Sequence, residues 1–118
     1  MPHKILVIDD DPLIRLAAET WLKAAGYQVA ACADGASALR LAGTEAPDAV
    51  LLDLQLGDED GFAVAAALAR IFAGRAAPVI FMSASEPAAG ASALFLLKPL
   101  SRTALVAKLA AAGLPPAP

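Results

Sequence analysis

The sequence predicts an α/β fold, in which a doubly wound sheet of five parallel strands carries helices on both faces. Two observations predict it. Five short and mostly apolar runs recur along the chain, and segments with helical spacing of apolar residues separate the first four runs and follow the fifth. Runs of this length that alternate with helices are typical of parallel strands covered on both faces. The 118 residues are expected to form one domain, because they leave no room for a second.

The predicted elements alternate along the chain. The strands are KILVI, QVAAC, AVLLD, PVIFMS and ALFLLK. The helices are expected over residues 12–25, 35–43 and 61–73, with a last helix after Ser101. Pro12 is tolerated in the first turn of the first helix, and Gly26 ends that helix. Asp34 is a suitable N-cap for the second helix, which we expect to end at Gly43.

The segment between the last two strands is short. Only residues 84–97 separate Ser83 from Lys98, and they must hold a loop and the whole fifth strand. A helix of mean length alone takes about 11–12 residues. Pro87 and Gly90 also interrupt the segment. We therefore expect the fourth helix to be reduced to a loop or a single turn.

Composition argues against several classes of protein. The net charge is −3 and no basic run occurs, which argues against a surface that binds nucleic acid directly. No stretch approaches the roughly 18 continuous apolar residues of a membrane span, and the first residues lack the order of a signal peptide. The single cysteine, Cys32, cannot form an internal disulfide, so a cytoplasmic location is expected. Residues 1–113 are expected to form the domain and 114–118 a disordered tail or linker stub.

Polar side chains follow the predicted strands at the points where they end. The residues at these ends are Asp9, Asp10 and Asp11 after the first strand, Asp53 on the third, Ser83 on the fourth and Lys98 on the fifth. In open parallel sheets the functional crevice lies at the carboxyl ends of the strands. We therefore expect these acids, this hydroxyl and this amine to converge on one edge, where Asp11 acts only as a helix cap.

The convergence predicts phosphoryl chemistry at a metal site. Several carboxylates around one point need a counter-charge, and Mg²⁺ is the usual partner of a few carboxylates and phosphate oxygens. Asp53 stands alone on its strand end and is the best candidate nucleophile, because an aspartyl carboxylate can accept a phosphoryl group. Ser83 and Lys98 could bind phosphoryl oxygens, while the metal neutralises charge on the transferring group.

Together these motifs resemble the receiver domains of bacterial two-component response regulators. VIDDDP is similar to the acidic pair of that family, LLDLQLGDEDG to its phosphoacceptor loop, and LLKP to its lysine followed by a cis-proline, here Pro99. Ser83 stands at the hydroxyl position of the family. The resemblance covers nearly the whole chain and implies the flavodoxin-like receiver topology, with strand order 2-1-3-4-5.

The resemblance also implies a set of roles at the site. Asp53 would accept a phosphoryl group from a histidine kinase or phosphotransfer protein in a Mg²⁺-dependent reaction. Asp10 would bind the metal directly and Asp9 mainly through water. Asp53 and the backbone carbonyl of Gln55 would complete the protein share of the metal shell.

A switch is implied at two further positions. Ser83 would move toward the phosphoryl group, and Phe95 would turn into the space that Ser83 vacates, although Phe95 could equally be plain core. The signal would pass to an unknown downstream target or output domain. The family often has proline where Gly57 stands and normally has a full fourth helix, so the usual output face is in doubt here. We expect phosphorylation to order the loop over residues 84–93 instead.

Two other functions compete with this one. A phosphatase of the haloacid dehalogenase type would need a general acid two residues after the nucleophile, and that position holds Gln55. A pseudo-receiver that serves only as an adaptor would not need the complete set of site residues. The absence of a G-x-x-x-x-G-K loop argues against a nucleotide hydrolase. We therefore expect no enzyme activity beyond self-phosphorylation and autodephosphorylation at Asp53.

Overall fold

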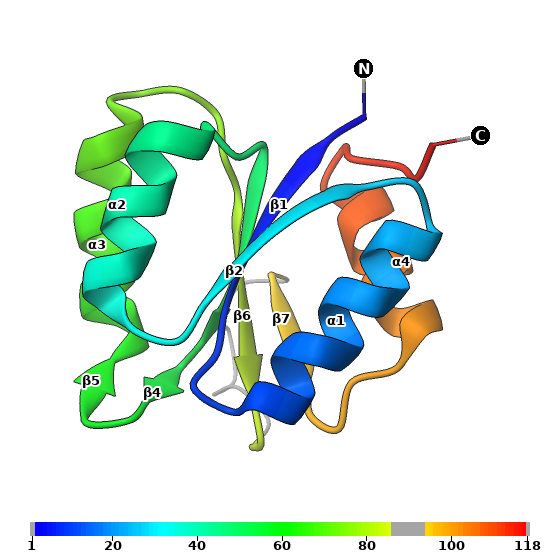
Figure 1. The fold of residues 1–118 in the computed structure, drawn as a ribbon, viewed down its shortest axis with the longest axis horizontal. Helices are drawn as coiled ribbons and strands as arrows, with labels where there is room; N and C mark the ends of the chain where they lie inside the picture. The colour runs from blue at the N-terminus through cyan, green and yellow to red at the C-terminus, as the bar shows by residue number, and fades with distance from the viewer. Residues whose placement is uncertain (1, 86–93, 118) are drawn as a thin grey trace.

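The computed structural model describes residues 2–85 and 94–117, which form a central sheet between two layers of helices (Figure 1). The helices and strands, in chain order, are β1 (Lys4–Ile8), α1 (Pro12–Ala24), β2 (Gln28–Cys32), α2 (Gly35–Glu45), β3 (Ala49–Asp53), β4 (Gln55–Leu56), β5 (Glu59–Asp60), α3 (Gly61–Phe72), β6 (Val79–Ser83), β7 (Phe95–Leu97) and α4 (Arg102–Ala111). Within these residues, no helix is both long and apolar enough to cross a bilayer.

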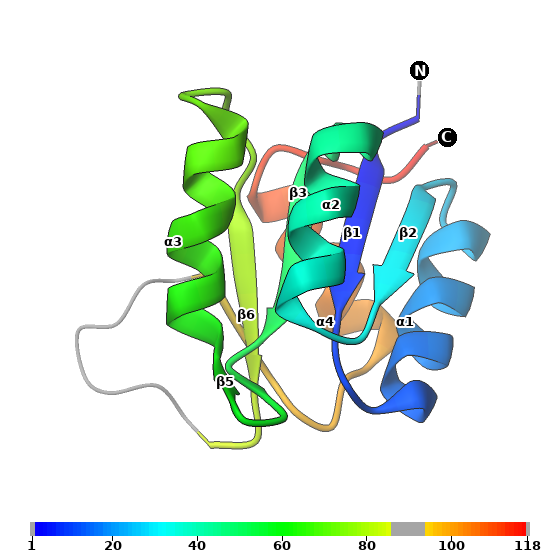
Figure 2. The same cartoon turned by 60° about the vertical axis from the view of Figure 1, so that its left-hand side comes forward.

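The sheet has the strand order β2-β1-β3-β6-β7, and all its neighbouring strands are parallel. The strands β4 and β5 form a separate antiparallel hairpin, so β6 and β7 are the fourth and fifth strands of the sheet. The predicted order 2-1-3-4-5 is therefore confirmed. Figure 2 shows β2, β1 and β6 across the sheet, with α3 lying over β6.

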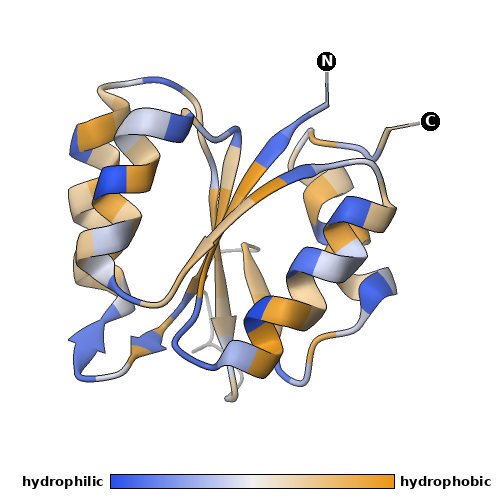
Figure 3. Ribbon diagram, in the orientation of Figure 1, coloured by the Kyte–Doolittle hydropathy of each residue, from blue (hydrophilic) through white to orange (hydrophobic). Residues whose placement is uncertain are grey.

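Side chains of the central strands alternate between two hydrophobic cores. Ile5 and Val7 belong to the core that α1 and α4 cover, and Leu6 and Ile8 belong to the core under α2 and α3. All four residues are completely buried, because a strand with helices on both faces has no solvent side. Hydrophilic residues gather at the carboxyl end of the sheet and on the hairpin (Figure 3).

Acidic N-caps begin the helices much as the sequence predicts. Asp11 accepts a hydrogen bond from the backbone of Leu13 at the start of α1, and Asp34 accepts one from Ser37 at the start of α2. The predicted end of α2 at Gly43 is wrong, since the helix continues to Glu45. A single glycine inside a helix costs only about 1 kcal/mol. The helix ends where Ala46, which precedes a proline, adopts a left-handed conformation with φ of 47°.

The loop or single turn that we expected in place of a helix between the last two strands of the sheet falls mainly on residues 86–93, which lie outside the described residues. The helix labelled α4 is the last helix, which follows β7. The adjoining strands are described on both sides of this segment. β6 ends at Ser83 and β7 begins at Phe95, in parallel register with it.

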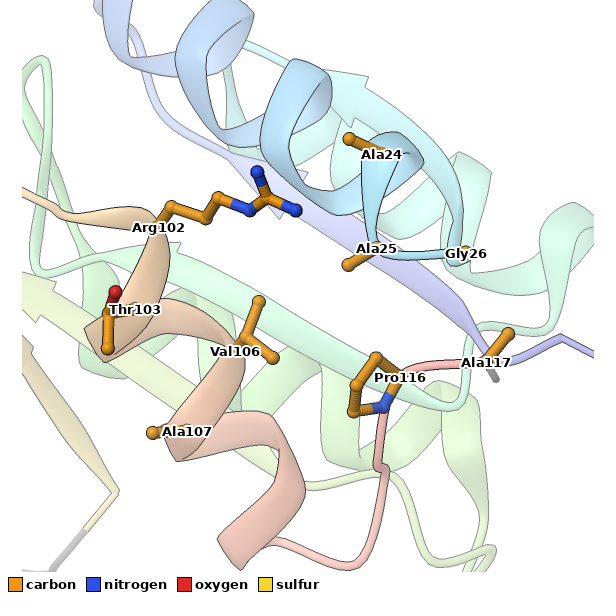
Figure 4. Close-up of a pocket in the computed structure, with 9 residues that line it drawn as sticks. All are labelled: Ala24, Ala25, Gly26, Arg102, Thr103, Val106, Ala107, Pro116 and Ala117. Atoms are coloured by element: carbon orange, nitrogen blue, oxygen red, sulfur yellow. The ribbon is translucent and has the colours of Figure 1, made fainter.

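Packed structure continues past residue 113, where the sequence suggests that the domain ends. Leu114, the first residue of the expected tail, is buried in the core, and its carbonyl accepts a hydrogen bond from the Tyr27 hydroxyl. Farther on, Pro116 and Ala117 lie beside Gly26 and line an open pocket of about 690 Å³ between α1 and α4 (Figure 4). A domain boundary at residue 113 would therefore cut through packed structure.

The hairpin of β4 and β5 was not predicted, although a Gly-Asp pair is a common two-residue hairpin turn. Gly57 occupies this turn with a φ of 61°, a conformation that glycine adopts without strain. The hairpin carries Glu59, whose carboxylate accepts a hydrogen bond of 2.9 Å from the backbone of Gly35 at the start of α2. Asp60 caps α3 by accepting a bond from Phe62. The hairpin therefore joins the first turns of two helices.

Because Glu59 satisfies a free N–H group at the positive end of α2, Glu59→Ala should lower the free energy of unfolding by about 1 kcal/mol. Urea unfolding followed by circular dichroism would measure this change. The exposed neighbour Asp58 provides the control, and Asp58→Ala should unfold like the wild type. Equal stability of the Glu59→Ala and Asp58→Ala variants would contradict this role for Glu59.

Candidate functional site

Three aspartates meet at the carboxyl edge of the sheet. β1 and β3 are parallel neighbours, so Asp9, which follows β1, and Asp53, which ends β3, lie at the same edge. One carboxylate oxygen each from Asp9, Asp10 and Asp53 lies within 4.8 Å of the others. Asp9 and Asp53 are buried, whereas Asp10 is exposed at the rim. The structure therefore brings together the acids that the sequence predicts to converge.

Lys98 connects these acids across three strands. Its ammonium lies 2.9 Å from Oδ2 of Asp9 and 3.2 Å from Oδ2 of Asp53. Its backbone N–H donates to the carbonyl of Ser83, at a distance of 2.7 Å, which places Lys98 beside the end of β6. The peptide bond to Pro99 is cis, as the sequence motif suggests. The predicted lysine thus reaches the center of the acidic cluster.

Asp9 is held from several directions. Its Oδ1 accepts a hydrogen bond of 2.9 Å from the backbone N–H of Asp11, and its own N–H donates to the carbonyl of Cys32 at 3.2 Å. Its carbonyl accepts a bond of 2.8 Å from Nη1 of Arg15 on α1. Sequence reasoning missed Arg15, because a charged residue on the first turns of a helix gives no sign that it reaches back to a strand.

Burial opposes ionisation at the center of the cluster. Desolvation raises the pKa of Asp9, and this effect outweighs the hydrogen bond from Asp11 and the charge of Lys98, which both lower it. Desolvation also acts to lower the pKa of Lys98, but its contacts with Asp9 and Asp53 prevail and raise that pKa. The ion pair with Lys98 by itself would lower the pKa of Asp9. Because that pKa is raised instead, Lys98 offsets only part of the cost of burying the carboxylate.

The donor atoms fit a hard divalent cation. Oδ2 of Asp9 is buried, and the ammonium of Lys98 lies 2.9 Å from it as an ion-pair partner. Together with Asp10 and Asp53 it forms an all-oxygen, anionic set, which is the kind of donor set that Mg²⁺ prefers. An oxygen with free lone pairs in an anionic cluster is what a cation would use.

The loop after Asp53 is closed by backbone contacts. Oδ1 of Asp53 accepts a hydrogen bond of 3.2 Å from the backbone N–H of Gln55. Farther on, the N–H of Gly61 donates to the carbonyl of Leu54, and a side chain at Gly61 would collide with the carbonyl of Asp53. Glycine is required there because the two backbone segments pack closely. The side chain of Gln55 is exposed, and its amide has no proton to give as a general acid.

The two predicted switch residues lie on neighbouring strands. Ser83 ends β6, and its Oγ accepts a hydrogen bond of 3.1 Å from the N–H of Ser85. Phe95 is half-buried on β7, and its ring lies 5.4 Å from that of Phe81, its partner in register. Phe81 in turn packs on Phe62, at 4.9 Å. The described contacts of Phe95 are therefore aromatic, on the face of the sheet that α3 shares.

An apolar groove of about 470 Å³ adjoins the acidic edge. It lies between α1 and the turn of Lys98 and Pro99, and Trp21 lines it. Leu13 stands at its edge with 74% of its surface exposed. The larger pocket of Figure 4 contains none of the predicted site residues. Trp21, the only tryptophan, is thus placed to report on events near Lys98.

The sequence model of the family described as "Response regulator receiver domain" matches residues 5–110. The chain is 36% identical over 115 residues to the transcriptional regulatory protein PrrA of Mycobacterium tuberculosis, covering 92% of the chain and 48% of PrrA. It is also 36% identical over 118 residues to the response regulator MprA of Mycolicibacterium vanbaalenii, covering 94% of the chain and 50% of MprA. The chain thus spans about half the length of these relatives.

Solved structures share the fold. A CheY-like response regulator receiver domain from Methylobacillus flagellatus matches with a TM-score of 0.84 at 23% identity, covering 95% of this chain and 99% of that one. The receiver domain of the sensor histidine kinase PA1611 from Pseudomonas aeruginosa matches with a TM-score of 0.81 at 27% identity, covering 96% and 99%. In that structure a magnesium ion is coordinated in the active-site cleft.

The raised pKa of Asp9 predicts that its charge costs stability when no metal is bound. In metal-free buffer, Asp9→Asn should raise the free energy of unfolding by roughly 1 kcal/mol, because the amide keeps the shape without the buried charge and Lys98 keeps Asp53 as its partner. The pKa of Asp9 in the folded protein lies above its unfolded value of 3.8, so the folded state binds the extra proton. The stability of the wild type should therefore fall, relative to Asp9→Asn, as the pH rises above 3.8.

Urea unfolding at a series of pH values would measure this difference. Asp58→Asn, which neutralises an exposed acid outside the cluster, is the matched control and should show no such gain. If Asp9→Asn were less stable than the wild type at neutral pH without metal, the buried charge would not be a cost.

Proposed function

The chain belongs to the response regulator receiver domain family, and on this premise we propose that it is a phosphoacceptor module whose acceptor is Asp53. The donor would be a phosphohistidine on a histidine kinase or a phosphotransfer protein. One observation carries the proposal: the ammonium of Lys98 bridges the buried carboxylates of Asp9 and Asp53 at the carboxyl edge of the sheet. An acceptor aspartate, a second acid and a cation therefore already lie in contact.

The transfer is a displacement at phosphorus. A carboxylate oxygen of Asp53 forms a bond to the phosphorus as the P–N bond of the phosphohistidine breaks, and the imidazole leaves with that electron pair. The product is an acyl phosphate on Asp53. Water can later attack the same phosphorus, which releases inorganic phosphate and restores the carboxylate. Both steps need positioning and charge stabilisation rather than a general acid, which agrees with the amide side chain at Gln55.

Lys98 and Ser83 are the proposed partners of the phosphoryl group. The ammonium that now lies 3.2 Å from Asp53 would bind one phosphoryl oxygen. The hydroxyl of Ser83, on the strand next to Asp53, would donate to another. Its present acceptor role toward the N–H of Ser85 leaves the hydroxyl proton free for that bond.

Mg²⁺ would be held by the carboxylates of Asp9, Asp10 and Asp53, with the backbone carbonyl of Gln55 as a further ligand. The convergence of the three acids, with a buried oxygen of Asp9 among them, supports this assignment. When bound, the ion supplies positive charge that offsets the negative charge on the transferring phosphoryl group. Without it, the ammonium of Lys98 is, among the described residues, the cation in contact with the carboxylates of Asp9 and Asp53.

The signal would leave through the elements around Ser83 and Phe95. The relatives PrrA and KdpE of Mycobacterium tuberculosis are named as transcriptional regulatory proteins, and the chain covers 48% and 34% of their lengths. We therefore propose that an output domain or a separate target protein reads the state of the domain, which extends over residues 1–113 together with the packed Leu114. Neither a phosphatase nor an adaptor without phosphorylation is favoured by this site.

Mg²⁺ should stabilise the folded protein. At a Mg²⁺ concentration ten times its dissociation constant, the gain is about 1.4 kcal/mol, because the ion binds the folded state alone. Thermal unfolding across a range of Mg²⁺ concentrations would show a rising melting temperature. Asp10→Asn should reduce the rise, while Asp58→Asn should leave it intact. A melting temperature that does not respond to Mg²⁺ would contradict the site.

Phosphorylation should occur at Asp53 alone. Incubation with acetyl phosphate and Mg²⁺ should add one phosphoryl group that is labile to base, as measured by mass spectrometry of the intact protein. Asp53→Asn should abolish the addition, because an amide of nearly the same shape is a poor nucleophile. Asp58→Asn should be labelled like the wild type. Persistent labelling of Asp53→Asn would show that the acceptor is a different residue.

A further inference from the structure

Arg15 contacts the acidic edge through the backbone rather than through a carboxylate. It lies on α1, and its Nη1 donates a hydrogen bond of 2.8 Å to the carbonyl of Asp9. That carbonyl belongs to the peptide unit that joins Asp9 to Asp10. The orientation of this peptide influences the directions in which the side chains of both residues leave the backbone. Arg15 is therefore bonded to the peptide that links two acids of the cluster.

The other described contacts of Asp9 do not involve the peptide between Asp9 and Asp10. The bond from its N–H to Cys32 fixes the preceding peptide, and the bond to its Oδ1 from Asp11 fixes its side chain. Lys98 contacts its other carboxylate oxygen, Oδ2. Arg15 therefore supplies, among the described contacts, the bond that locks the peptide between Asp9 and Asp10.

We propose that Arg15 is a positioning residue for the divalent cation: it fixes the peptide between Asp9 and Asp10 so that both carboxylates face the metal. This inference rests on the proposed function, since it assumes that the acids hold Mg²⁺. Residues that orient metal ligands from behind commonly change affinity by about 10- to 100-fold when they are replaced.

The positive charge of Arg15 would weaken the binding of a cation, whereas its hydrogen bond to the carbonyl of Asp9 would strengthen it. A guanidinium near the site repels Mg²⁺, so its removal would tighten binding if charge were its main effect. Arg15 is only partly buried, and solvent screens that repulsion. Loss of the hydrogen bond frees the peptide, which weakens binding. Positioning and repulsion thus predict changes of opposite sign.

The test is a titration of the wild type and of Arg15→Met with Mg²⁺ alone, in buffer without phosphodonor. Binding is followed by calorimetry and by the fluorescence of Trp21. Arg15→Met should bind Mg²⁺ roughly tenfold more weakly. Arg15→Lys, which keeps the charge but loses the planar fork, should lie between the two. Arg40→Met removes a charge from an exposed position on α2 and should bind like the wild type or slightly more tightly.

Each outcome bears on the inference. Equal or tighter binding by Arg15→Met would overturn it, as would a variant that loses stability in EDTA yet keeps its affinity for Mg²⁺. If Arg15→Met does not fold, unchanged affinity in Arg15→Lys overturns it and weaker affinity supports it. Failure of the wild type itself to bind Mg²⁺ would instead contradict the proposed function, so the two failures are distinguishable.

Discussion

The contact on which the site depends is the ammonium of Lys98 between Asp9 and Asp53. It joins the ends of β1, β3 and β7, three of the five strands of the sheet, at the edge where the carboxyl ends of the parallel strands lie. The raised pKa of Asp9 shows that this cation does not fully offset the cost of burying the acid. The three acids at this edge therefore form an anionic cluster whose negative charge Lys98 offsets only in part.

The fold supplies this arrangement by burying apolar strands on both faces. Residues such as Ile5 and Leu6 alternate between the two cores, and the helices above them leave only the edge of the sheet open to solvent. Polar groups at the strand ends are then held by backbone contacts that the core makes rigid. Asp9 is the clearest case, since Cys32 on β2, Asp11 and Arg15 all hold it. The stability that the core supplies thus offsets the free-energy cost of burying charged groups at the site.

The loop that follows Asp53 also contacts the helices beside it. After Asp53 the chain forms the hairpin of β4 and β5, and Glu59 on this hairpin bonds to the first residue of α2. Gly61 then packs on the backbone of the loop, where no larger side chain fits. The loop that follows Asp53 is therefore in contact with the starts of α2 and α3, which cover the same face of the sheet.

The sequence by itself determined the alternation of strands and helices and the polar residues at the strand ends, because both follow from local patterns. The strand order was implied by the resemblance to receiver domains. Apolar runs of strand length define β1, β2 and β3 with the bounds that the structure has, and the polar residues directly after them must lie at one edge. Only the tertiary structure decided the partners of those residues. Arg15 on Asp9, Glu59 on Gly35 and Leu114 in the core are contacts between different elements of the fold, and the local periodicity of the sequence carries no information about them. The end of α2 likewise depended on the left-handed turn at Ala46 and the proline after it, because one glycine was too weak to stop a helix whose N-terminus is held by Asp34 and Glu59.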